Sequence, residues 1–549
     1  MSLGNEQVQI PFLSASIREL SNVKDYLPVS CLDCPLHIEL SKLRCENAYR
    51  RKLHQKALER EAKLKEEIVE LKAKVRLRER QLFGRKCEKG HNIQDSATSD
   101  VKAHKKPRGQ QRGSKGHGRR DYSHLSSREE VHEIPESECR CPVCGLPLAS
   151  FPGTEESEMI EIEEKAYRRV IKRKRYKPTC KCGALPGIVT APAPAKLIAK
   201  GIFGVSVWVY MLLDKFLFMR PTYRLLADLR THGLCMAQGT LTDGLKAIAP
   251  LLVPILEAIT SKNLEENRWH ADETSWLVFT TVEGKVGYRW YMWVFASSFT
   301  VVYKLDRSRS ARVPKQHFGV TREGILVVDR FSSYKAMAKE TNITLAFCWA
   351  HVRRDFLRVG NNWPQHERWA LRWVEEIGKL YHLNKRRLAV VRQPEVFAER
   401  EHELRSAVER MAKKRNAELS GENIYRTREK VLLSLKNHWE GLTIFLDHPE
   451  VPMDNNEAER LERQPVIGRK NFYGSGAVWS GLLAAVMFSI FQTLALWKIN
   501  PRLWLTSYLE ACAANQGKVP KDIRSFLPWN MTEEQRKALS LEPESKTSS

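Results

Sequence analysis

Two carboxylates stand within or directly after β-patterned segments and are the first candidates for chemistry. The segment Arg268–Thr274 holds the acidic pair Asp272 and Glu273, and the apolar run 324–328 is followed by Asp329. A buried carboxylate is costly unless something compensates its charge. Two carboxylates on neighbouring strands would repel each other, and the pKa of each would rise. A divalent cation between the two side chains would relieve both effects.

The ion that best suits such a pair is a hard cation. Mg²⁺ takes carboxylate oxygens and keeps waters or phosphate oxygens at its remaining positions. Asp272 and Asp329 therefore form a candidate Mg²⁺ site, provided that their strands are neighbours. The alternative is that each aspartate only caps the end of its strand.

A third carboxylate follows much later, in the segment Asp454–Glu459. Asp and Asn before a helix are strong N-caps, and Glu459 has the capping-box position if Asn456 is the cap. The functional alternative is that Glu459 lies on a helix beside the two strand acids. Arg469 and Lys470 follow and add cationic groups suited to phosphate.

The segment Cys348-Trp349-Ala350-His351 precedes a further basic residue, Arg354. The Cys-x-x-His spacing is half of a zinc site, but no clean second half lies nearby in the sequence. We predict that His351 and Arg354 lie near the acids, where they contact the scissile phosphate or orient a carboxylate. A histidine satisfied inside the core is the alternative.

The elements that must position these residues alternate in a recognisable order. Hydrophobic periodicity predicts three successive strands, then helix, strand, helix and strand; the ranges are 269–280, 286–296, 299–305, 309–317, 324–328, 331–339 and 343–348. This order is typical of a ribonuclease-H-like domain, in which adjacent central strands carry the acids. We assign its two parts to 266–354 and 451–511, with a charged helical insertion at 355–450 between them and a C-terminal tail at 512–549.

One apolar stretch, Ala477–Trp497, has the length of a membrane span. It carries Ser480, Ser489, Gln492 and Thr493, and no other segment resembles a second span. We therefore predict a buried core helix and no membrane partner.

Composition points to a polyanionic partner. The chain has 549 residues, and its formal net charge of +25 favours DNA or RNA. Twelve cysteines are too few for a disulfide scaffold, and their close pairs suggest metal ligation in a reducing compartment. The N-terminus has no secretory pattern, so we expect a cytoplasmic protein.

The N-terminal third contains several distinct segments. Residues 1–35 hold Cys31 and Cys34, whose role is open, and residues 36–84 have a helical pattern. Its heptad seam favours a dimeric coiled coil, and the alternative is a helix packed on its own body. The basic Gly-rich segment 85–135 is either a solvated linker or an arm that contacts DNA phosphates; the candidates are Lys105, Lys106, Arg108, Arg112, Lys115, Arg119 and Arg120.

Two cysteine pairs predict a structural zinc ribbon over residues 136–190. The predicted Zn²⁺ ligands are Cys141, Cys144, Cys180 and Cys182, with Cys139 as a spare thiol. Between the pairs, basic residues alternate with Tyr and β-branched residues, which indicates a strand with one cationic face. Arg173, Lys174 and Arg175 are candidates there for DNA contact, and a solvated face is the alternative. A small helical unit follows at 196–262.

Taken together and in order, these motifs are similar to those of a known family. The chain resembles the transposases of the insertion-sequence-66 family, which are bacterial DDE transposases. The motifs are Leu82–Arg85, Lys115–His117, the cysteine pairs, Tyr223-Arg224, His270–Thr274, Cys348–His351, Asp454–Asn456 with Glu459-Arg460, Arg469–Asn471 and Leu527–Asn530. The chain departs from the family pattern in its Cys-x-Cys pair and in Arg330-Phe331 after Asp329.

The resemblance implies roles for these residues. Asp272, Asp329 and Glu459 would be the three catalytic acids that hold two Mg²⁺ ions, with Mn²⁺ as a substitute. The expected fold is multidomain α+β, with a coiled-coil helix, zinc ribbon, helical unit and ribonuclease-H-like catalytic domain with a helical insertion. Expected partners are double-stranded DNA, further copies of the chain in a homodimer or higher oligomer, and small accessory proteins of the same element, at the bacterial nucleoid.

The expected reaction is cleavage at the ends of an insertion element, followed by joining of the 3′-OH to target DNA. Two alternatives come from other functional classes. One is a catalytically silent DNA-binding regulator derived from a transposase. The other is a stand-alone ribonuclease-H-like nuclease.

Overall fold

The structure is a computed structural model that describes residues 35–83, 146–147, 159, 166–176, 188–319, 322–421 and 424–541. The four predicted zinc ligands, Cys139 and the basic arm at 105–120 lie outside these ranges. The chain divides into two compact units, residues 1–100 with Asn361–Gln365, and the remainder. We describe each unit by itself.

In the first unit, residues Pro35–Phe83 form one continuous helix, α1, of 49 residues. The helix predicted at 36–84 is therefore confirmed, and at 1.5 Å per residue it is about 70 Å long. The apolar seam side chains Leu64, Ile68, Leu71 and Val75 are all exposed. Pairing of this seam with a second copy of the chain remains a prediction.

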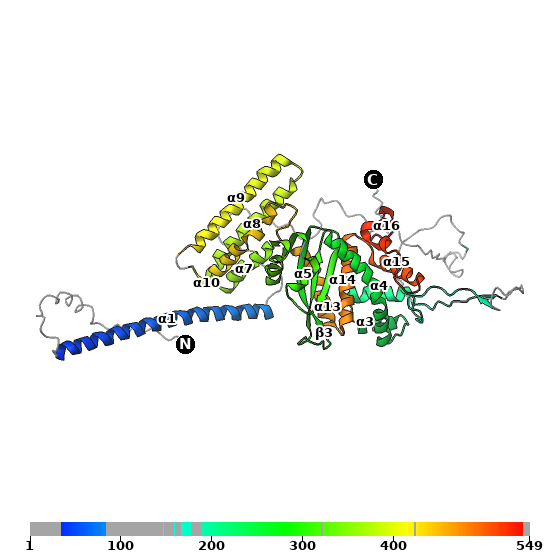
Figure 1. Cartoon of the computed structure of the whole chain (residues 1–549), viewed down its shortest axis with the longest axis horizontal. Helices are drawn as coiled ribbons and strands as arrows, with labels where there is room; N and C mark the ends of the chain where they lie inside the picture. The colour runs from blue at the N-terminus through cyan, green and yellow to red at the C-terminus, as the bar shows by residue number, and fades with distance from the viewer. Residues whose placement is uncertain are drawn as a thin grey trace. The chain divides into compact units, whose positions relative to one another are not determined.

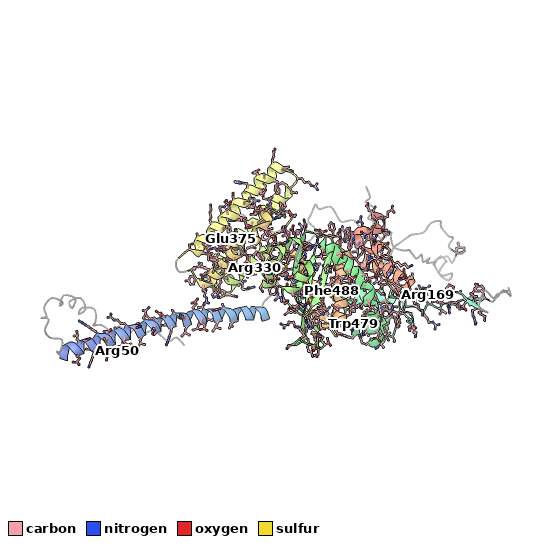
Figure 2. The ribbon with its side chains drawn as sticks, in the orientation of Figure 1. Arg50, Arg169, Arg330, Glu375, Trp479 and Phe488 are labelled. Atoms are coloured by element: carbon pink, nitrogen blue, oxygen red, sulfur yellow. The ribbon has the colours of Figure 1, made fainter. Side chains whose placement is uncertain are left out.

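A short two-stranded ribbon precedes the central sheet in the second unit. Strand β1 (Arg175–Tyr176) pairs antiparallel with β2 (Val189–Thr190). The longer basic strand predicted here is wrong, because residues 166–174 have no regular structure. Tyr167 and Val170 in this segment are exposed, so no apolar face is buried to stabilise a longer strand. Figure 2 shows the Arg169 side chain on this extended segment.

A mixed sheet forms the centre of the second unit, with strand order β5-β4-β3-β6-β7. Strand β4 is antiparallel to both of its neighbours, β3 and β5, whereas β3, β6 and β7 are parallel. The predicted strands are confirmed with small shifts at their ends: β3 Arg268–Val278, β4 Arg289–Ala296, β5 Val301–Asp306, β6 Glu323–Val328 and β7 Asn342–Phe347. A two-residue strand, β8 (Gly474–Ser475), pairs with the end of β3.

Two long helices pack on this sheet. Helix α14 (Val478–Leu496) packs on β5 and on α4 (Gln238–Leu264). Figure 1 shows α14 beside α4. Helices α2 (Val205–Phe216), α3 (Thr222–Thr231) and α15 (Pro501–Ala514) complete this layer. The core includes Phe488 of α14, whose ring lies 6.1 Å from that of Trp276 (Figure 2).

The polar residues of α14 have a structural role that its composition alone did not reveal. Strand β5 is an edge strand, and the backbone N–H groups of Val301 and Tyr303 donate to Thr493 Oγ1 and Ser489 Oγ. The helix therefore satisfies donors of an edge that would otherwise remain unpaired. The prediction of a buried core helix at 477–497 is confirmed.

Helices α4 and α14 are both long and apolar enough to cross a membrane by length and composition alone. The expectation that only one segment has this character is therefore wrong. Of the most apolar window, 67% is buried in α14 and 39% in α4. A helix that packs inside a core is apolar for the same reason as a membrane span, so composition does not distinguish them.

The remaining helices connect and extend the sheet. Helix α5 (Arg312–Phe318) and α6 (Ser332–Ala338) flank β6, and α7 (Trp349–Asn362) follows β7. The predicted insertion is helical and consists of η3 Pro364–His366, α8 Glu367–Ala389, α9 Pro394–Leu419, α10 Arg426–Asn437, α11 Trp439–Thr443 and η4 Ile444–Leu446. The insertion was predicted to begin at residue 355, but the helix that leads into it, α7, already begins at Trp349.

After the insertion the chain returns to the sheet through α12 (Asn456–Leu461) and α13 (Arg463–Phe472). The predicted C-terminal tail contains η5 Arg524–Phe526, η6 Pro528–Asn530 and α16 Glu533–Ala538. Leu527 and Met531 are buried in the core, and Trp504 Nε1 donates to the Phe526 carbonyl. This segment therefore packs on the body of the protein.

Candidate active site

The sheet register brings Asp272 and Asp329 to the same level. Strands β3 and β6 are parallel neighbours, with His270 opposite Val327. Two positions further along each strand, the same register places Asp272 opposite Asp329. Neighbouring strands lie about 4.8 Å apart, so the two acids are adjacent at the carboxyl end of β6. The strands that carry the two acids are therefore neighbours, as a shared metal site requires.

The start of α12 is fixed to β3 by one asparagine. Asn455 is buried, its Nδ2 donates to the Ala271 carbonyl at 2.8 Å, and its Oδ1 lies 2.9 Å from His270 Nδ1. The Glu459 N–H donates to the Asn455 carbonyl at 3.2 Å, one helical turn later. We call these contacts of Asn455 with His270, Ala271 and Glu459 the clamp. The clamp holds Glu459 on a helix that packs against β3 and β4.

The alternative of a capping box at this helix, with Asn456 as the cap, is wrong. The N-cap is Asn455 rather than Asn456, and no side chain caps the helix. The Asn455 side chain is occupied by its bonds to β3, and Asp454 Oδ1 accepts the Asn456 N–H at 3.1 Å instead. Glu459 thus has no capping role.

The electrostatics of Asp272 show that the acids interact. Burial is the main cause that raises the pKa of Asp272 to about 7, and the negative charges of Glu273, Asp329 and Glu459 contribute to this rise. The Glu273 N–H, which donates to Asp272 Oδ1 at 2.9 Å, opposes this shift. In the metal-free chain, the carboxylates at this edge therefore repel one another.

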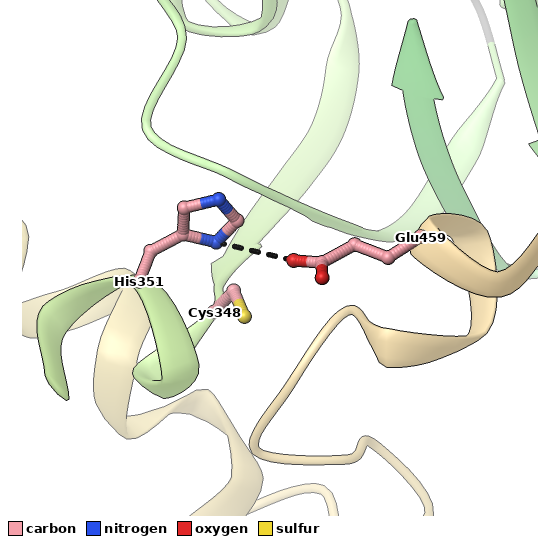
Figure 3. Close-up of side chains that lie close together, drawn as sticks. All are labelled: Cys348, His351 and Glu459. Atoms are coloured by element: carbon pink, nitrogen blue, oxygen red, sulfur yellow. Dashed lines mark ion pairs between the residues drawn. The ribbon is translucent and has the colours of Figure 1, made fainter. Parts of the chain in front are cut away.

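His351 and Arg354 lie at the third acid. Arg354 Nη2 donates to Glu459 Oε1 at 2.5 Å, and His351 Nδ1 lies 3.7 Å from the same oxygen (Figure 3). Burial lowers the pKa of His351, and Arg354 adds to this effect. Of the two roles that the sequence suggested for these residues, the geometry matches orientation of a carboxylate.

Glu273 has a different environment from Asp272. Its Oε2 accepts the Tyr334 hydroxyl at 2.6 Å, and its Oε1 accepts Arg309 Nε at 2.8 Å. The Arg309 guanidinium also lies 4.0 Å from the centre of the Phe331 ring. Sequence reasoning missed Arg309 and Tyr334, because nothing in their local sequence marks them as partners of Glu273.

Arg469 and Lys470 differ in their surroundings. Arg469 Nη1 donates to the Ser275 carbonyl at 2.7 Å and to Thr274 Oγ1 at 3.2 Å, so it braces α13 against β3. Lys470 is exposed. The candidate DNA contacts Arg173, Lys174 and Arg175 are exposed as well.

One further buried acid, Glu462, was not identified from the sequence. Both carboxylate oxygens lack a hydrogen-bond partner among the described residues. Burial raises its pKa well above the usual value, and Asp272 and Glu273 contribute. We infer that Glu462 is uncharged in the metal-free protein. Burying an unpaired carboxylate costs far more free energy than burying the protonated carboxylic acid.

The chain has relatives of similar length. It is 27% identical over 431 residues to the uncharacterized protein y4jD of Sinorhizobium fredii (strain NBRC 101917 / NGR234). The aligned region covers 75% of this chain and 81% of the relative. The uncharacterized protein y4hP of the same organism is 28% identical over 437 residues, or 73% and 75% of the two chains. No solved structure is significantly similar.

A family model gives the family of the chain, which the descriptions of these relatives do not name. The model described as "Transposase IS66 family" matches residues 200–482, a range that includes Asp272, Asp329 and Glu459. The match extends over more than half of the sequence and over the whole central sheet. The chain therefore belongs to the IS66 transposase family.

Proposed function

We propose that the chain is a DNA transposase that cleaves at the ends of an insertion element and joins the resulting 3′-OH to target DNA. Its sheet would be a ribonuclease-H-like core, which the strand order β5-β4-β3-β6-β7 supports. The observation that carries the proposal is the register that sets Asp272 opposite Asp329, together with the clamp that holds Glu459 beside β3.

The donor set suits Mg²⁺ or Mn²⁺. Three carboxylates are the ligands that hard divalent cations prefer. The pKa of Asp272 is raised by burial and by the neighbouring carboxylates, and a bound cation would offset both effects. Asp272, Asp329 and Glu459 would together hold the ions. When bound, two such ions would supply activation of water or a 3′-OH and stabilisation of the leaving oxygen.

The chain's own side chains would hold these acids in place before DNA binds. Arg354 orients Glu459, and Asn455 fixes the helix that carries it. On the other flank of β3, Arg309 links Glu273 to Phe331, whose N–H donates to Asp329 Oδ1 at 2.8 Å. Such support reduces the reorganisation that the reaction requires.

Binding of DNA would use the positive charge of the chain. The net charge of +25 and the exposed Arg173, Lys174 and Arg175 suit a phosphate backbone. The basic arm and a zinc ribbon would add contacts, and α1 would pair two copies so that each holds one element end. Accessory proteins of the same element and a place at the bacterial nucleoid complete the proposal.

A nicking and joining assay tests the proposal. Purified protein is incubated with Mg²⁺ and duplex DNA that carries the sequences flanking its gene. We expect a nick at one defined 3′ end, transfer of that end to target DNA, and loss of both with Asp329→Asn. Nicking without joining would favour a nuclease. Specific binding without either reaction, including after addition of the neighbouring gene products, would favour a regulator.

A further inference from the structure

A second group of metal-ligand side chains lies directly beside the three acids. Cys348 is buried between β7 and α7, His351 lies in the first turn of α7, and Glu459 comes from α12. One ligand atom from each residue lies within 4.8 Å of the other two. Figure 3 shows the three side chains facing a common space. The fold thus supplies the partner that Cys-x-x-His lacks in the sequence.

The chemistry of this group differs from that of the three acids. A thiolate, an imidazole and a carboxylate favour Zn²⁺ and Co²⁺ over Mg²⁺. Tetrahedral coordination with bonds of about 2.0–2.3 Å sets the ligand atoms about 3.5 Å apart. The present spacing would have to contract by roughly 1 Å, which side-chain rotation can provide. Three protein ligands would leave one position open, as in other zinc sites that exchange a ligand.

The surroundings of the sulfur suit a bound metal. The Asn455 N–H donates to Cys348 Sγ at 3.2 Å. Burial raises the pKa of the Cys348 thiol and this N–H opposes the rise, so a bound cation would supply the main stabilisation of the thiolate that binds it. The same Asn455 backbone belongs to the clamp that holds Glu459.

Arg354 competes for the same carboxylate. It donates to Glu459 Oε1, and it lies 3.5 Å from His351 Nδ1. Its side chain is 36% exposed, so it can leave the site for solvent. The group can therefore exist in two arrangements, one with Arg354 paired to Glu459 and one with a cation in its place.

We propose that Cys348, His351 and Glu459 bind one thiophilic divalent cation, such as Zn²⁺, and that this cation removes Glu459 from Asp272 and Asp329. The bound cation would then inhibit the Mg²⁺-dependent reaction. The binding of the cation stands by itself, whereas the inhibition rests on the proposed function. Glu459 would serve two sites that cannot both be complete at once.

Cobalt binding to the full-length protein tests the metal site. Co²⁺ bound by a thiolate gives a near-ultraviolet charge-transfer band and, when tetrahedral, intense visible bands. We expect Cys348→Ser to bind one fewer Co²⁺ than the wild type and to lose the corresponding part of both bands. The predicted ribbon thiols are the same in both proteins, so their signal cancels in the difference spectrum.

A matched variant controls for the loss of a buried thiol. Cys512 is also buried, but it lies in α15. We expect Cys512→Ser to give the wild-type cobalt spectrum, and circular dichroism should show that both variants fold. If folded Cys348→Ser binds as much Co²⁺ as the wild type, with the same bands, the metal site is refuted.

Arg354→Met tests the competition. Removing a partly exposed ion pair should tighten Co²⁺ binding by up to about fivefold. Weaker binding would show that Arg354 supports the site and would contradict the two-state arrangement.

The inhibition is measured on nicking, with each protein compared with itself in the absence of Zn²⁺. Added Zn²⁺ should inhibit the wild type at lower concentration than Cys348→Ser, and Arg354→Met at the lowest concentration, if it retains nicking. Equal inhibition of wild type and Cys348→Ser would contradict this regulation. Absence of nicking in the wild type would instead contradict the proposed function, while cobalt binding decides the metal site independently.

Discussion

Asp272 and Glu273 follow each other in β3, so their side chains point to opposite flanks of the strand and meet different neighbours. On one flank Asp272 meets Asp329 and Glu459, and burial, with the charges of Glu273, Asp329 and Glu459, raises its pKa to about 7. On the other flank burial also raises the pKa of Glu273, but the hydrogen bonds that it accepts from Tyr334 and Arg309 oppose this rise. Both side chains are carboxylates in one strand, and both are largely buried. The comparison teaches that uncompensated negative charge, rather than an acid by itself, marks the place where the fold expects a cation.

The largest expected effect is that of Asp272→Asn on activity. The amide keeps the size of the side chain but removes the charge that would hold metal, so nicking should fall by about 10³-fold or more. Initial rates at saturating Mg²⁺ measure this loss. The variant should remain folded, because removing a repulsive charge stabilises the metal-free protein. An active Asp272→Asn protein would contradict the claim that Asp272, unlike Glu273, holds the catalytic metal.

Glu273→Ala should affect stability instead. The substitution leaves Arg309 and the buried Tyr334 hydroxyl without their partner, which should cost about 3 kcal/mol. Urea unfolding of wild type and variant measures the difference, with Asp272→Asn as the control on the other flank. A variant as stable as the wild type would show that Glu273 is not compensated in the way described.

Asn455→Ala tests the clamp that brings Glu459 to β3. Loss of the bonds to His270 and to the Ala271 carbonyl frees the start of α12, and the third acid loses its fixed position. Removal of a supporting residue of this kind should lower nicking by about 10–100-fold. The loss should be partly recovered at high Mn²⁺ concentration, which an unfolded variant would not show.

The smallest effect concerns pH. Because the folded pKa of Asp272 lies above its usual value of 3.8, the native state binds more protons than the unfolded state between about pH 4 and 7. Its contribution to stability is therefore present below about pH 4 and is lost as pH rises through 7. Thermal unfolding of metal-free protein should show this trend, and Asp272→Asn should show less of it.

Metal should reverse the trend. At pH 8, Mg²⁺ at 100 times its dissociation constant should add about 2.7 kcal/mol and raise the melting temperature by a few degrees. Asp272→Asn should respond weakly. An equal response of both proteins would place the stabilising ion elsewhere.

The sequence predicted the sheet well because its signals are local. Alternating apolar residues mark β3, β4 and β5, and the run before Asp329 marks β6, so the adjacency of the two acids could be expected from strand order. The apolar segment 477–497 was also placed in the core, although its Ser489 and Thr493 had no assigned partners. Those partners are backbone groups of β5, nearly two hundred positions away.

The parts that could not be predicted depend on contacts between distant segments. Asn455 looks like a helix cap in sequence, and only its contact with Ala271 shows that its side chain is occupied elsewhere. Cys348 and His351 looked like half a site until the fold placed Glu459 opposite them. Arg309 carries no local mark of its bond to Glu273.

The most direct test compares two acids of α12 that stand two positions apart. Glu459 lies at Arg354 and His351, whereas Glu457 Oε2 lies 3.5 Å from His270 Nε2 on a partly exposed surface. With Mg²⁺ and element-end DNA, Glu459→Gln should abolish nicking, and Glu457→Gln should reduce it by only a few fold. Equal activity of the two folded variants would contradict the central claim that Asp272, Asp329 and Glu459 form one metal-dependent site.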